Sequence, residues 1–218
     1  MKNHPADHAR NSFTLLELLV VIGIIAILLV AIVPAVNSLS KSSGRKSAIN
    51  IVVGTLEQAR SQAIKDGRAT YVAFAAQPTD GATDISDKGI IDRYFYHSVA
   101  IFEDDPSGSP TKTQLTPWKV LPTGISVRTE ISFSSSNAAW KSDDFVFVPD
   151  ASKIKKFPFV KFNSVGALEA PTPAWSGPIP IRLFEGSVNG TAEIPTTKNN
   201  KDETINIARL TGRPEYVP

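Results

Sequence analysis

The stretch that decides the fold is residues 12–36, which read SFTLLELLVVIGIIAILLVAIVPAV. From Leu18 to Val36 nineteen residues carry no charge. A helix of that length reaches about 28 Å, close to the ~30 Å hydrocarbon core of a bilayer. Beyond Asn37 apolar residues are interleaved with Ser, Thr, Pro, Lys and Asp. The pattern predicts one membrane-crossing helix at about residues 15–36, followed by a soluble part.

Three other interpretations of the apolar run compete with this one: a cleaved secretory signal, a buried core helix and a simple signal anchor. A core helix fits poorly, because residues 19–33 are apolar on every face and the remaining chain is too polar to enclose them. A secretory signal would begin with basic residues, as Lys2 and Arg10 do, but its apolar centre would be shorter. Glu17 also argues against it, since a carboxylate deep in a membrane costs roughly 2.5–3.5 kcal/mol and requires a partner.

The segment Ser12-Phe13-Thr14-Leu15-Leu16-Glu17, with the apolar run behind it, resembles the class III signal of type IV pilins and type II secretion pseudopilins. The resemblance implies a cytoplasmic leader of residues 1–12, cleavage by prepilin peptidase between Ser12 and Phe13, and N-methylation of Phe13. Glu17 then takes the family's acidic position, the fifth of the mature chain. Pro34 takes the position where many members have a Pro that loosens the helix. The family usually has Gly before the cut, where this chain has Ser12.

The mature amino terminus has an electrostatic problem that Glu17 would solve. Cleavage leaves a positive amine on Phe13 at a helix N-terminus, where the macrodipole disfavours positive charge. The resemblance implies that Glu17 of one subunit meets the Phe13 amine of a neighbour within a filament, in a low dielectric that strengthens the attraction. The alternative is that Glu17 only assists peptidase recognition or lies among lipid headgroups.

The same resemblance implies a set of partners and a location. The partners are prepilin peptidase, other pilin or pseudopilin subunits, an inner-membrane assembly platform and the lipid bilayer. Because Lys2 and Arg10 favour a cytoplasmic amino terminus, we expect a single-pass inner-membrane protein with a periplasmic head. Later it would be part of a pilus or pseudopilus filament.

The helical pattern continues beyond the membrane segment. An apolar stripe recurs at helical spacing through Ile49, Val52, Val53, Leu56, Ala59, Ala63 and Ile64. Gly67 is a good terminator after Lys65 and Asp66. We therefore expect one helix over residues 13–66, with Pro34 as a hinge.

Residues 67–218 alternate as strands do, in runs rich in Val, Ile, Phe and Tyr and separated by Pro and Gly. The predicted strands are Ala69–Ala75, Arg93–Phe102, Gly124–Ile131, Asp144–Val148, Pro158–Phe162, Ile179–Phe184 and Thr204–Leu210. A closing hairpin turn is expected at residues 211–213. The predicted fold class is α+β, with the long amino-terminal helix packed on a β-rich antiparallel head, as in the pilin fold.

Four local phrases are similar to those of the H-type minor pseudopilins: ARSQA at 59–63, WKVLPTGI at 118–125, FNSVGAL at 162–168 and LTGR at 210–213. They favour a minor subunit. The heads of that subfamily carry a strand with an Asn-Ser or Pro-x-Gly turn and end in a Gly-containing hairpin.

Catalytic and ligand-binding chemistry finds little support in the sequence. The net charge of +2 gives no basic face for nucleic acid, and the absence of Cys excludes thiol chemistry. His4 and His8 lie in the leader, which leaves His97 without a partner motif, so we expect no enzyme activity and no cofactor. Asp80, Asp84 and Asp87 are weak calcium candidates, as are Asp104 and Asp105.

Two functions follow as hypotheses. The first is a structural, minor subunit of a type II secretion pseudopilus or type IV pilus. The second is a membrane-anchored extracytoplasmic binding module that does not polymerise. A membrane-anchored enzyme is disfavoured, since no catalytic constellation is visible.

Overall fold

The computed structural model describes residues 14–76, 93–107, 112–128, 141–146, 154–169, 177–189, 192–196 and 202–217. Within the helix, the side chains of residues 29–42 also lie outside the description. The chain divides into two compact units, Met1–Ser42 and Ser43–Pro218. The predicted α+β class with antiparallel sheets is confirmed.

The helix α1 spans Leu15–Asp66 and ends at Gly67, whose φ of 64° is the left-handed conformation typical of a helix C-terminus. In the second unit one face of α1 is completely buried by residues spaced three or four apart: Ala48, Val52, Leu56, Ala59 and Ala63. The predicted stripe was too wide, since Ile64 is 48% exposed. Small side chains on the buried face let the helix lie close to the sheets.

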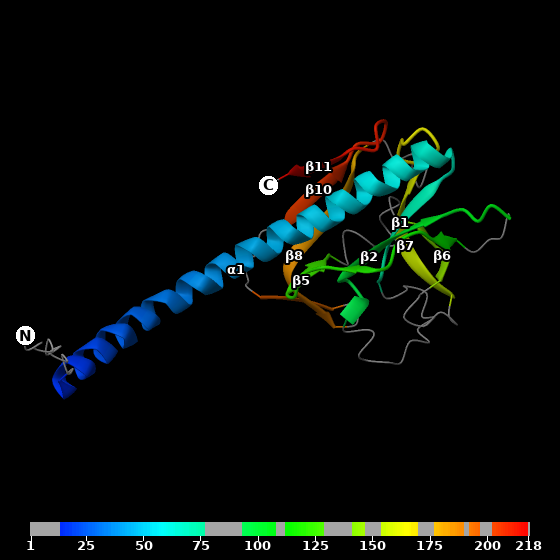
Figure 1. The fold of residues 1–218 in the computed structure, drawn as a ribbon. Helices are drawn as coiled ribbons and strands as arrows, with labels where there is room; N and C mark the ends of the chain where they lie inside the picture. The colour runs from blue at the N-terminus through cyan, green and yellow to red at the C-terminus, as the bar shows by residue number, and fades with distance from the viewer. Residues whose placement is uncertain are drawn as a thin grey trace, which may run out of the picture. The chain divides into compact units, whose positions relative to one another are not determined.

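One sheet contains six strands: β1 Thr70–Phe74, β2 Ser98–Glu103, β3 Thr113–Gln114, β4 Lys119–Val120, β6 Lys141–Val146 and β7 Ile154–Phe162 (Figure 1). The order is β3-β2-β1-β7-β6, with β4 also paired to β2, and every pair is antiparallel. An isolated bridge between Lys112 and Phe145 links the two edges of this sheet.

The other strands are β5 Ile125–Val127, β8 Ile179–Asn189, β9 Ala192–Pro195, β10 Glu203–Ile207 and β11 Pro214–Val217. They are ordered β11-β10-β8-β5, and β9 pairs with β8. The strands β10 and β11 form the hairpin that the sequence predicts at the carboxyl end, with Thr204 opposite Val217.

Two hydrophobic cores lie on opposite faces of the six-stranded sheet. The first joins the buried face of α1 to both sheets, through residues such as Leu56, Val72 and Ile181. The second is aromatic and contains Tyr71, Phe95, Phe102, Trp118, Phe145 and Phe157. Because both faces of β1 are covered, all five of its residues are buried and its sequence shows no alternation of apolar and polar residues.

Several predicted strand limits are wrong. Residues 93–97 form a helical turn and a left-handed Tyr96 (φ 61°), so that β2 begins only at Ser98. The strand β7 begins at Ile154, before the predicted start at Pro158. The strand β10 ends at Ile207, before the predicted end at Leu210. The short strands β3, β4 and β9 were not predicted, because two to four residues are too few to show alternation.

Candidate processing and assembly site

The helix α1 begins with reciprocal hydrogen bonds between Thr14 and Glu17. Glu17 Oε2 accepts hydrogen bonds of 2.9 Å from both the backbone N–H and the hydroxyl of Thr14. The backbone N–H of Glu17 donates in return to Thr14 Oγ1 at 3.2 Å. This is a capping box, which satisfies two amide groups that the helix itself leaves unpaired. Sequence reasoning missed this role, although the Thr-x-x-Glu spacing signals it.

The capping box leaves part of the Glu17 carboxylate available. Oε1 accepts no hydrogen bond from the described part of the chain, and the residue is exposed. A carboxylate has about four lone-pair sites over its two oxygens, so capping and binding of a further cation are compatible. Glu17 can therefore start its own helix and still meet a positive group from another molecule.

An uncovered apolar surface follows the capping box. From Leu15 to Leu28 the large apolar side chains are 44–83% exposed within the first unit. Surfaces of this kind mark contact with another protein or with lipid. In the part of the chain that the structure describes, no helix is both long and apolar enough to cross a membrane.

Several other residues of the predicted sites fall outside the part of the chain that the structure describes. Ser12, Phe13, Asp80, Asp84 and Asp87 lie outside the described residues. Helix α1 is assigned without a break across Pro34, whose side chain is not described. The proposed cut, methylation site, hinge and first calcium cluster therefore stay predictions.

The second calcium candidate, Asp104 with Asp105, is held by hydrogen bonds to the protein. Asp104 Oδ1 accepts from the Tyr71 hydroxyl at 2.8 Å and pairs with Lys112 Nζ at 3.0 Å. Asp105 accepts from the backbone and hydroxyl of Ser107. Among the described residues, no three His, Cys, Asp or Glu side chains are grouped to hold a metal ion.

These contacts set the ionisation of the two aspartates. Partial burial alone would raise the pKa of Asp104, but hydrogen bonds from Tyr71 and Lys112, with the charges of Lys112 and Lys161, lower it. The hydrogen bonds from Ser107 lower the pKa of Asp105. Both carboxylates are therefore ionised at neutral pH and serve the fold of this loop.

His97 is a half-buried packing residue just before β2. Its Nδ1 lies 2.9 Å from the carbonyl oxygen of Ile125 and 3.3 Å from Ser126 Oγ. The Ser126 hydroxyl donates to the carbonyl of Gly186 at 2.8 Å, so it is engaged with the backbone. The described residues around His97 thus use these groups for structure, without an acid that would complete a catalytic triad.

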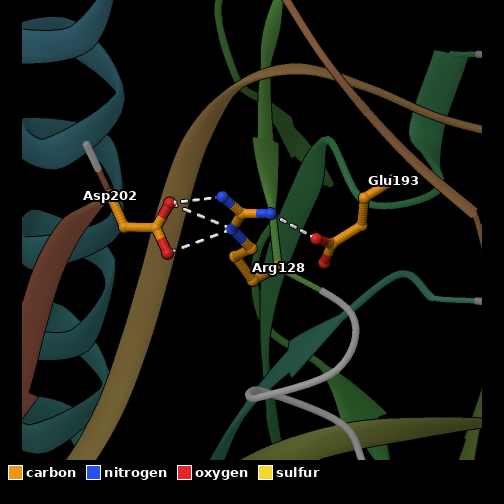
Figure 2. Close-up of polar contacts among 3 residues, drawn as sticks. All are labelled: Arg128, Glu193 and Asp202. Atoms are coloured by element: carbon orange, nitrogen blue, oxygen red, sulfur yellow. Dashed lines mark hydrogen bonds and ion pairs between the residues drawn. The ribbon is translucent and has the colours of Figure 1, made fainter. Parts of the chain in front are cut away.

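A charged cluster at the end of β5 was not found from the sequence. Arg128 Nε lies 3.0 Å from both oxygens of Asp202, and Nη2 lies 2.7 Å from Oδ1, while Nη1 pairs with Glu193 (Figure 2). The guanidinium also stacks over the ring of Phe184, 4.6 Å from its centroid. The hydrogen bonds that Arg128 donates to the carboxylates of Asp202 and Glu193 outweigh burial and raise the pKa of Arg128. The cluster ties β5, β9 and the start of β10 together.

Three of the four phrases noted in the sequence meet at one end of the second unit. They are the end of α1, the turn after β7 and the turn between β10 and β11 (Figure 1). Arg60 Nε donates to the carbonyl of Thr211 at 2.6 Å, and Leu168 N–H donates to the carbonyl of Arg209 at 2.9 Å. The sequence did not predict this junction, because the three segments that form it are far apart along the chain.

Comparison with known proteins gives one finding, at the amino-terminal end. Residues 7–33 match the family model described as the prokaryotic N-terminal methylation motif. Searches of the curated proteins and of the solved structures found no match. The matched segment contains the Ser12-Phe13 bond, the capping box and most of the apolar run. The chain therefore carries a prokaryotic N-terminal methylation motif, the class III signal, at residues 7–33.

Proposed function

We propose that this chain is a structural subunit of a type II secretion pseudopilus or type IV pilus, most similar to the H-type minor pseudopilins. The observation that carries the proposal is the methylation motif at residues 7–33, in register with the Thr14–Glu17 capping box. The α+β architecture, with a helix at the amino terminus and antiparallel sheets, agrees with a pilin fold.

Processing is the first step of this function. Prepilin peptidase cuts between Ser12 and Phe13 on the cytoplasmic side and methylates the new amine of Phe13. Thr14 and Glu17 both lie after the cut, so the mature chain keeps its capping box. The new terminus is then one residue away from an ordered helix start.

Anchoring and assembly use the same helix. The sequence from Leu18 to Val36 has the length and apolar character of a membrane span, and the helix around it is assigned without a break. On assembly the amine of Phe13 in one subunit binds the available oxygen of Glu17 in another. The exposed side chains from Leu15 to Leu28 pack against neighbouring helices.

The head contributes shape and contacts. Its described polar groups, including His97 and Arg128, are engaged in hydrogen bonds and ion pairs that hold strands together. We propose that the chain has no catalytic role and that its specificity lies in the surface of the head.

The alternative is an anchored binding module that does not polymerise. It would have the same helix and the same head, but it would need neither a cut nor a free amine at Phe13. The two functions therefore differ in the mature amino terminus.

Mass spectrometry of chain extracted from membranes separates them. In a host with active prepilin peptidase, we expect the first peptide to begin at a methylated Phe13. If the chain from that host still carries its leader, with Met1 or the residues next to it at the amino terminus, the filament-subunit function is rejected in favour of the anchored module.

A further inference from the structure

The junction at the end of α1 is closely packed, and two glycines make the packing possible. A Cβ on Gly166 would lie 2.6 Å from Ile64 Cδ1, and one on Gly212 would lie 2.1 Å from the carbonyl oxygen of Gly166. Their φ angles are 75° and 64°, in the left-handed region that favours glycine. The two turns therefore pack against each other through backbone atoms, and the turn after β7 packs against side chains of α1.

Hydrogen bonds fix the turn after β7 from within. Asn163 Oδ1 accepts from the backbone N–H groups of Val165 and Ala167, at 3.2 and 2.9 Å. The Gly166 N–H donates to the Asn163 carbonyl at 2.8 Å, and the Asn163 N–H donates to the Ala167 carbonyl at 2.9 Å. A surface built on this turn loses little conformational freedom when it binds a partner.

This rigid junction displays apolar side chains to solvent. Leu210 is 86% exposed, Val165 is 73% exposed and Ile64 is 48% exposed, one from each of the three converging segments. We call these three residues the junction patch. Single exposed apolar residues are ordinary, but three on adjoining, preorganised elements are typical of a contact surface.

Two exposed cations adjoin the junction patch in the sequence. Lys65 adjoins Ile64, and Arg213 closes the turn that carries Leu210; both are exposed, and neither has an ion pair among the described residues. Among the acids of these segments, Glu57 pairs with Arg60, whereas Asp66 accepts a hydrogen bond from the neutral Gln62 and keeps its charge, and Glu215 is exposed in β11. An acidic partner would find two available cations here.

We propose that the junction patch binds an acidic protein segment, one that presents apolar side chains flanked by carboxylates. A second copy of the same surface is disfavoured, because Lys65 and Arg213 would then face like charges. An anionic membrane surface is also disfavoured, since two cations are fewer than the four to eight of typical lipid-binding clusters. The proposal depends on the head alone and stands whether or not the chain forms filaments.

The test uses the detergent-solubilised full chain and two labelled peptides. One peptide alternates leucine and phenylalanine with glutamate, and the other has lysine at each glutamate position. Fluorescence anisotropy measures their dissociation constants. We expect the acidic peptide to bind about tenfold or more tightly than the basic one.

Matched variants locate the binding. Val165→Ser with Leu210→Ser removes the apolar contacts, and we expect about tenfold weaker binding of the acidic peptide. Ile194→Ser, at a residue of β9 that is 51% exposed, is the control and leaves binding unchanged. Lys65→Glu with Arg213→Glu should reverse the preference toward the basic peptide. Circular dichroism confirms that each variant folds.

Four outcomes overturn the proposal. They are failure of the acidic peptide to bind, equal binding of both peptides, and binding that the serine pair does not change. The fourth is a different occupant of the patch. It would be shown by self-association, or by binding to phosphatidylserine vesicles, that the serine pair abolishes while the acidic peptide does not bind.

Discussion

Replacing Gly212 with Ala tests the packing of the junction most sharply. Gly212 is buried, has a φ of 64°, and would place a Cβ 2.1 Å from the carbonyl oxygen of Gly166. The ring of Phe162 lies 3.1 Å from the same point. A backbone oxygen cannot swing aside as a side chain can, so the turn after β7 must move.

Two costs add at this position. A left-handed conformation costs a residue with a Cβ roughly 1–2 kcal/mol, and forced overpacking costs typically ~1–3 kcal/mol. We therefore expect Gly212→Ala to lower the free energy of unfolding by about 2–5 kcal/mol. The same change at Gly124 (φ 83°) meets no atom within 4 Å, so it should incur only the conformational cost of about 1–2 kcal/mol.

Gly166→Ala lies between them. Its nearest neighbour is Ile64 Cδ1, the end of a side chain that is 48% exposed and can shift at a lower cost than a backbone oxygen. Urea denaturation of the solubilised full chain, followed by tryptophan fluorescence, measures all three. The expected order of destabilisation is Gly212, then Gly166, then Gly124. A loss at Gly212 no greater than the loss at Gly124 would refute the packing argument.

Four other predictions follow from the same structure. Arg128→Gln leaves two carboxylates without their guanidinium and should lower the free energy of unfolding, measured in urea, by about 1–3 kcal/mol; an unchanged unfolding midpoint would contradict a stabilising role of the charged cluster around Arg128. The pKa of Asp104 is lowered on folding, so its stabilisation is present above the unfolded pKa near ~3.9 and is lost as pH falls through the folded value. Asp104→Asn should thus reduce stability at neutral pH and flatten the acid-induced decline, which denaturation at several pH values checks; an unchanged decline contradicts it. Glu17→Ala should leave membrane insertion intact and weaken incorporation into sheared filaments, and Glu17→Gln, which keeps an oxygen for the cap, should do the same if charge pairing matters; normal incorporation of both opposes the pairing. Ser12→Gly should raise the cleaved fraction on immunoblots, whereas a lower fraction would contradict the assigned cleavage site.

The amino-terminal methylation motif was predictable because its signals are local. Phe13, Glu17 and the apolar run lie within one short segment, and the match over residues 7–33 covers them. The second role of Glu17 was also written there, in the spacing from Thr14. Thr14, the partner that the carboxylate meets within its own chain, lies only three residues away.

Much of the head followed from local pattern, but its pairings did not. Strand β1 is covered on both faces, so its sequence shows no alternation that would tell which residues face α1. The two-residue strand β3 exists only because Phe102 and Glu103 of β2 offer it a partner. Such ladders depend on tertiary neighbours.

The clusters that hold the head together are long-range. Arg128 meets Glu193 and Asp202 across 65 and 74 residues, and no local pattern announces that meeting. The sequence segments around Arg60, Gly166 and Gly212 were each recognised separately. Their convergence required the structure, since it depends on two turns and a helix end packing together.

Cysteine cross-linking tests the central claim most directly, because the chain contains no Cys and any added one is unique. Leu16→Cys and Ile24→Cys place single thiols on the exposed apolar surface of α1. Oxidation of intact cells should then give cross-linked products with itself or other pilin-like subunits when prepilin peptidase is active, and none when the peptidase is inactive. Cross-linking that is the same in both strains, or absent from both, would contradict assembly through the processed helix.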